Sequence, residues 1–156
     1  MQTKANVAML QEGSVGTAMI HQEALQRCLR KLQDTMPIIG LGNPRIGKPD
    51  ASWEFCRPFG WVVGFYAGQL WLALQLPGDP RFLNAARARR NVFRQLLQVR
   101  QAQDHDLGMQ YSLSCVAEWQ MTGDAEARQL GLAAANLLLE RFRSDGQYIQ
   151  AWNPRS

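Results

Sequence analysis

The feature that most constrains the fold of this chain is a repeat of about 45 residues. Gly78 and Gly123 lie 45 residues apart, and each is followed directly by an aspartate, Asp79 or Asp124. Glycine commonly ends a helix, whereas aspartate begins one by accepting a hydrogen bond from a free backbone N–H. Each Gly-Asp pair therefore predicts a junction between two helices. A period of this length indicates a series of stacked helical hairpins.

The two helices of each predicted hairpin differ in composition. Residues 64–76 are apolar on almost every side of a helix, whereas residues 81–99 are amphipathic with outward arginines, and residues 107–121 and 125–142 repeat this order. A helix that is apolar all round must be buried on all sides. This favours a closed α/α toroid with an inner ring of helices over an open α-solenoid, whose helices are each half-buried. No segment has the strict alternation of a half-buried strand, so we expect an all-α fold.

The chain before the repeat has a different character. An apolar stripe predicts a helix over residues 17–33, which Pro37 should end. Residues 37–60 contain four prolines and four glycines and predict a long irregular loop. Helical hairpins then occupy residues 61–156, with a third cycle beginning near residue 147. We expect one incomplete toroid domain over residues 1–156.

Charge and composition exclude several classes of partner. The net charge is +4, and its densest patch consists of Arg87, Arg89, Arg90 and Arg94. Positions 87, 90 and 94 share one face of a helix, which we expect to be a solvated outer face without the aromatic residues of a nucleic-acid site. No apolar run approaches the roughly 20 residues that a membrane span needs. Three cysteines at unpatterned spacings indicate reduced thiols in a cytoplasm. Two histidines and no cluster with metal-ligand spacing predict neither a metal nor another cofactor.

The repeat also predicts where a site would lie. Steps of 45 and 46 residues lead from Trp61 to Asp106 and then to Trp152, each just before an expected inner helix. Because inner helices of a toroid run in the same direction, these residues should meet at one mouth. Tryptophan faces stack on sugar rings, a carboxylate performs acid–base chemistry, and helix N-termini favour an anion. This combination suits an acidic sugar.

Simpler interpretations of the same residues remain open at this point. Asp106 is also compatible with a plain N-cap of the following helix. His105 is also compatible with a surface or capping histidine. Trp61 and Trp152 are also compatible with ordinary core aromatic residues.

Three segments in the same order resemble glycoside hydrolase family 88, the unsaturated glucuronyl hydrolases. They read WVVGFYAGQLWLA at 61–73, HDLG at 105–108 with YSLS at 111–114, and RF at 141–142 with GQYIQAW at 146–152. The resemblance covers about residues 37–152. It implies a toroid of six helical hairpins, of which this chain is roughly the first half.

The resemblance also implies an activity and roles for the site residues. The family hydrolyses unsaturated uronyl oligosaccharides left by polysaccharide lyases: a carboxylic acid protonates C4 of the vinyl ether, water adds at C5, and the hemiketal collapses. By this resemblance Asp106 is the catalytic carboxylate that supports the acid. His105 adjoins it, and Trp61 and Trp152 line the sugar site.

One departure from the family pattern affects activity. The family's general acid/base aspartate lies beyond Trp152 in the next inner helix, and this sequence stops at Ser156. We therefore expect the isolated chain to be truncated, inactive and prone to self-association through exposed inner helices. Two alternatives remain: a hydrolase of unsaturated rhamnogalacturonyl fragments with the same toroid, and a helical-repeat interaction module without catalysis.

Overall fold

The computed structural model describes residues 2–56, 59–76 and 79–153, and it forms two compact units, Met1–Ile38 and Ile39–Ser156. The first unit consists of one helix, α1, whose bounds are Gln2–Ile39. This helix is much longer than the predicted span of 17–33. Pro37 lies inside its last turn, so the prediction that this proline ends the helix was wrong. Within the described residues, no helix has the length and apolar character to cross a membrane.

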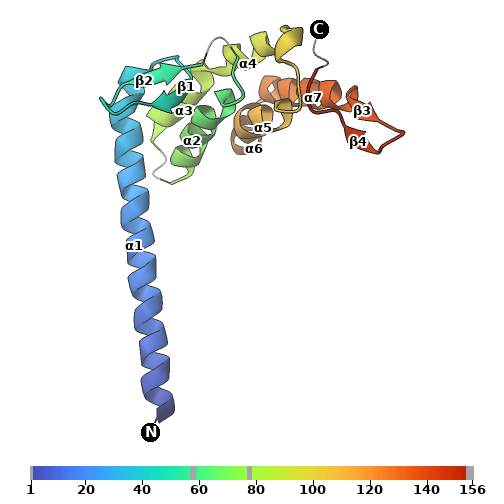
Figure 1. The fold of residues 1–156 in the computed structure, drawn as a ribbon. Helices are drawn as coiled ribbons and strands as arrows, with labels where there is room; N and C mark the ends of the chain where they lie inside the picture. Colours follow the sequence, from blue (N-terminus) through green and yellow to red (C-terminus); the bar gives the residue numbers. More distant parts are fainter. Residues whose placement is uncertain (1, 57–58, 77–78, 154–156) are drawn as a thin grey trace. The chain divides into compact units, whose positions relative to one another are not determined.

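The second unit contains the repeat and the candidate site (Figure 1). Its elements follow in the order β1 (Pro44–Gly47), β2 (Trp53–Phe55), α2 (Val63–Gln75), α3 (Pro80–Ala88), α4 (Arg90–Leu96), a 3₁₀ turn (Arg100–Ala102), α5 (Leu107–Tyr111), a π-helical segment (Ser112–Val116), α6 (Ala117–Thr122), α7 (Ala125–Leu139), β3 (Phe142–Arg143) and β4 (Tyr148–Ile149). The first helical hairpin is α2 with α3 and α4. The second is α5, the π-helical segment and α6, followed by α7.

The junctions between helices agree with the sequence where the structure describes them. Asp79 accepts a hydrogen bond from the backbone N–H of Arg81 at 2.9 Å, and Asp124 accepts one from Ala127 at 3.0 Å. Gly123 ends α6 in the left-handed region, with φ of 71°. These caps confirm both helix starts and the second helix end. Pro58, Pro77 and Gly78, which were assigned to the loop and to the first junction, lie outside the described residues.

Two short antiparallel hairpins correct the expectation of a chain without strands. Within the expected loop of 37–60, β1 pairs with β2, joining Pro44 to Phe55 and Gly47 to Trp53. Near the C-terminus β3 pairs with β4, where a third helical cycle was expected. These strands are two to four residues long, too short for alternation to appear in sequence, and local turns bring their partners together.

Helix α2 packs against α3 and the second hairpin, but it is not buried on every side. Val63, Ala67 and Leu70 are almost wholly inaccessible, whereas Leu72 and Leu76 are 62% and 51% exposed. The prediction of burial all round was therefore wrong for this chain. The buried side is packed very closely, because a Cβ added to Gly64 would lie 2.8 Å from the Cα of Gln110.

The predicted outer helix of 81–99 is divided in two at Arg89, whose side chain turns inward. Its guanidinium donates to the carbonyl of Gly40 at 2.7 Å and to that of Gly42, and it lies 4.5 Å from the ring centre of Tyr66. Burial lowers the pKa of Arg89 to about 10. This arginine connects the turn before β1 to the first hairpin, so the prediction that the arginines of residues 81–99 point outward was wrong at this position.

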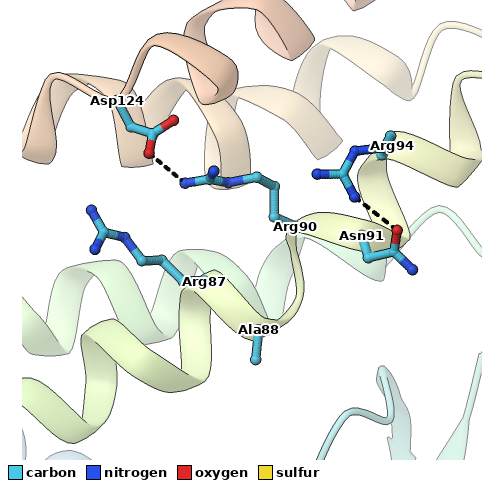
Figure 2. A pocket seen from close by; sticks show the side chains of 6 residues that line it. All are labelled: Arg87, Ala88, Arg90, Asn91, Arg94 and Asp124. Atoms are coloured by element: carbon cyan, nitrogen blue, oxygen red, sulfur yellow. Dashed lines mark hydrogen bonds and ion pairs between the residues drawn. The ribbon is translucent and has the colours of Figure 1, made fainter.

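Arg90 and Arg94 join the two hairpins, and Figure 2 shows the pair of Arg90 with Asp124. Arg90 pairs with the buried Glu118, with Asp124 at 2.8 Å and with Glu126 at 2.8 Å. Arg94 pairs with Glu126 as well. They border an open hollow of about 370 Å³ whose positive charge is balanced by these carboxylates. The expected solvated face is therefore an ionic interface between α4 and the second hairpin.

Candidate active site

The candidate site begins at the N-terminus of α5. Asp106 occupies the N-cap position, but its side chain makes no capping hydrogen bond. Instead, the carboxylate of Asp104 accepts the backbone N–H of Asp106 at 2.9 Å. The simple N-cap interpretation of Asp106 is therefore wrong. Its carboxylate is left for another partner.

That partner is His105, and the surroundings shift the ionisation of Asp106. The Nε2 atom of His105 lies 3.5 Å from Oδ1 of Asp106, whose side chain is 22% exposed. Partial burial raises the pKa of Asp106, the neighbouring charge of Asp104 raises it further, and His105 opposes both. Asp106 therefore keeps its proton to a higher pH than a free aspartate does.

His105 connects Asp106 to Trp152. Its Nδ1 lies 2.9 Å from the carbonyl oxygen of Ala151, and its backbone N–H donates to the same oxygen at 3.0 Å. Because a carbonyl only accepts, Nδ1 carries a proton in this contact, and Nε2 is the ring nitrogen that faces Asp106. The imidazole meets the Trp152 indole edge-on, with 5.2 Å between ring centroids. Three of the four predicted site residues are thus adjacent.

The two tryptophans differ in how closely they join this group. Trp152 is 70% exposed and follows β4, and the inner helix that the repeat predicts after it would lie outside the described residues. Trp61 is 56% exposed, lies two residues before α2 and meets the ring of Phe65 edge-on. Its segment reaches α5 through Gln110, whose Nε2 donates to the carbonyl of Gly60 at 3.4 Å. Neither tryptophan is a buried core residue.

Sequence reasoning missed Arg141 and Asp104. Arg141 lies in the third segment of the resemblance, and its guanidinium bonds the carbonyls of Gln103, Gln150 and Ala151. Backbone carbonyls occur at every residue, so no side-chain pattern could have indicated these bonds. Asp104 could have been found, because an aspartate two residues before a helix start is typical of a side chain that closes a turn.

Asp104, His105 and Asp106 also form a potential cation-binding group. One ligand atom from each lies within 4.8 Å of the others. Carboxylate oxygens with one imidazole nitrogen are a mixed set that several divalent metals accept. The sequence analysis named no such group, because it considered only cysteine and histidine spacing.

The fold and the site together define a class of protein. Successive helical hairpins pack with a largely buried first helix. At the start of the second hairpin, one histidine faces a carboxylate with a raised pKa and contacts an exposed tryptophan. These are features of an α/α-toroid protein.

Comparison with known proteins gives the particular relatives. The chain is 35% identical over 130 residues to the unsaturated glucuronyl hydrolase of Bacillus sp. GL1, and 34% identical over 133 residues to the unsaturated chondroitin disaccharide hydrolase of Streptococcus pneumoniae. Each match covers 83% of this chain and 33% of the relative. No protein-family model matches. The chain spans about one third of the length of the curated relatives it matches.

The solved structures agree with these sequence matches. The crystal structure of the Bacillus sp. GL1 enzyme superposes with a TM-score of 0.79 at 32% identity, covering 85% of this chain and 36% of that one. The unsaturated glucuronyl hydrolase of Streptococcus agalactiae gives a TM-score of 0.78 at 31% identity, with 85% and 34% covered. The chain is therefore homologous to unsaturated glucuronyl hydrolases of glycoside hydrolase family 88, and the prediction of an all-α fold of the α/α-toroid class is confirmed.

Proposed function

We propose that this chain contributes to the hydrolysis of unsaturated uronyl oligosaccharides by hydration of the C4–C5 vinyl ether. The observation that carries the proposal is the contact of His105 with both Asp106 and Trp152 at the start of α5. The names of the relatives support the substrate class. A solved variant of the Streptococcus agalactiae enzyme, 31% identical with a TM-score of 0.71, is described as complexed with dGlcA-GalNAc6S.

Each side chain has a role in this proposal. Trp152 offers an exposed indole face on which an apolar sugar face can stack, and we assign Trp61 the same role. His105 lies between the tryptophan and the carboxylate and contacts the sugar. Asp106 supports the proton donor, which the family resemblance places beyond Trp152.

Two further parts of the proposal concern the surroundings of the chain. We propose self-association through the exposed apolar side of α2, where Phe65, Leu72 and Leu76 are accessible; a monomer at all concentrations in sedimentation velocity would contradict it.

We also propose a cytoplasmic location, because none of the three cysteines is bonded to another.

The proposed activity is tested best in a chimera with a known enzyme. This chain would replace the matching segment of the Bacillus sp. GL1 enzyme, and loss of the ultraviolet absorbance of an unsaturated chondroitin disaccharide would report hydrolysis. We expect the chimera to be active. Asp106→Asn should lower its kcat by at least about a hundredfold, since the acid–base group that Asp106 supports contributes about 10²–10⁴.

A matched control separates the site from general damage. Asp145→Asn changes an exposed aspartate in the turn between β3 and β4 and should leave the rate within about twofold. Equal rates for the chimera and its Asp106→Asn variant would instead favour the interaction-module alternative. If the chimera does not fold, binding of the disaccharide to this chain can be measured instead by calorimetric titration. Asp106→Asn and Trp152→Ala are each expected to weaken that binding.

A further inference from the structure

Arg141 follows α7 and precedes β3, and its guanidinium is unusually well occupied. Its donors reach four acceptors at 2.8–3.0 Å, which are the carbonyl oxygens of Gln150, Gln103 and Ala151 and the Oδ1 atom of Asn153. Arginine presents its N–H groups in a fixed planar fork, so four simultaneous bonds hold the acceptors in one arrangement.

The four acceptors come from the two segments that form the candidate site. Three belong to residues 150–153, the segment that carries Trp152. The fourth is the carbonyl of Gln103, directly before the segment that carries His105 and Asp106. One side chain therefore bridges the tryptophan to the carboxylate through their backbones.

The carbonyl of Ala151 connects this bridge directly to His105, because both Arg141 and His105 donate to it. It accepts from Nη2 of Arg141 at 3.0 Å, and from the backbone N–H and the Nδ1 of His105 at 3.0 and 2.9 Å. The backbone N–H of Gln150 in turn donates to the carbonyl of Arg141 at 2.9 Å. Any shift of Arg141 must therefore move the acceptor that fixes the tautomer and orientation of the imidazole.

We infer that Arg141 is a positioning residue of the candidate active site: it holds Trp152 against His105 and thereby sets how His105 faces Asp106. The catalytic meaning of this inference rests on the proposed function, but the geometry it describes does not. The four acceptors of Arg141 are three backbone carbonyls and one side-chain amide oxygen, all of them uncharged. Its charge is used on neutral acceptors, which is the arrangement expected of a residue that organises loops.

Arg143, in the adjoining strand β3, supplies a matched control. It lies two residues further along and bonds the Oε1 of Gln150 and two local carbonyls, those of Glu140 and Phe142. It therefore reaches neither Gln103 nor Ala151 by any of these bonds. Arg143→Met removes an arginine from the hairpin without breaking the bridge.

The first arm of the test measures the geometry in the 156-residue chain by nuclear magnetic resonance. Nuclear Overhauser cross-peaks between the His105 and Trp152 rings should be present in the wild type and in Arg143→Met. They should disappear in Arg141→Met while the remaining spectrum stays folded. If Arg141→Met unfolds, Arg141→Lys decides, because lysine keeps the charge but cannot form the planar fork; its cross-peaks should weaken. Wild-type cross-peaks in the folded variant, or equal loss in Arg143→Met, would overturn the inference.

The second arm measures function separately. Calorimetric titration with an unsaturated chondroitin disaccharide should show about tenfold weaker binding in Arg141→Met and little change in Arg143→Met, because misplacement of about 1 Å costs up to a hundredfold. If the wild type binds no disaccharide while the first arm succeeds, the proposed function fails and the positioning role stands. If the wild type binds and Arg141→Met binds equally well, the positioning role is overturned and the proposed function stands.

Discussion

The two helices of the second hairpin begin with the same residue used in two different ways. Asp124 at the start of α7 accepts the backbone N–H of Ala127 and pairs with Arg90. Asp106 at the start of α5 makes no capping bond and faces His105 instead. One carboxylate satisfies the backbone, and the other is freed from it by Asp104.

The pKa values of the two groups follow from this difference. The backbone N–H of Ala127 lowers the pKa of Asp124, and Arg90 lowers it further. Burial and the charge of Asp104 raise the pKa of Asp106. A helix start therefore yields either a stable cap or a group suited to proton chemistry, depending on which neighbouring side chain takes the backbone donor.

The largest expected effect is a loss of stability when the ion pairs that hold Asp124 and Glu118 are broken. Arg90→Met leaves the carboxylate of Glu118, which is 2% exposed, without its main partner and also deprives Asp124 of its cation. The free energy of unfolding should fall by about 3 kcal/mol, as measured by urea denaturation. Arg45→Met is the control, because Arg45 pairs with Glu54 at the surface and should cost less than about 1 kcal/mol. Equal losses would mean that the buried network does not join the hairpins.

Alanine variants of the two aspartates should differ by a smaller amount in their free energy of unfolding. Asp124→Ala removes a cap and should lower the free energy of unfolding by about 1–2 kcal/mol. Asp106→Ala removes no capping bond and should lower it by less than about 0.5 kcal/mol. Urea denaturation of both variants near neutral pH measures this. A loss at Asp106 as large as that at Asp124 would return Asp106 to a capping role.

The smallest expected effect is a difference in pH dependence. Because the folded pKa of Asp124 is lowered, its stabilisation is present above the unfolded value of 3.8 and is lost as the pH falls through the folded pKa. Because that of Asp106 is raised, its favourable contribution is present below 3.8 and is lost as the pH rises through the folded pKa.

Asparagine variants should make these opposite slopes visible. Raising the pH from about 3 to 7 should increase the cost of Asp124→Asn. Over the same range, Asp106→Asn should gain stability relative to the wild type. Thermal unfolding across this range provides the measurement, and slopes of the same sign would contradict the contrast.

The helical hairpins and much of the site could be predicted from sequence because their causes are local. The caps at Asp79 and Asp124 and the left-handed Gly123 depend on a few adjacent residues. The repeat then located Asp106, and the motif around it named the family. His105 beside Asp106 required no tertiary information, since the two are neighbours in the chain.

Other features could not be predicted because distant groups decide them. The outward arginines became an interface because Glu118 and Glu126 arrive from the second hairpin. The apparent third helical cycle became the β3–β4 hairpin, whose strands pair with each other.

The sequence by itself determined that this protein is made of repeated helical hairpins and that a carboxylate stands at one helix start, since periodicity and caps are short-range. Only the tertiary structure decided that Trp152 meets His105 and that Arg141 holds them together. Those contacts depend on backbone carbonyls brought together from residues far apart in the chain, and such acceptors leave no mark in the order of side chains.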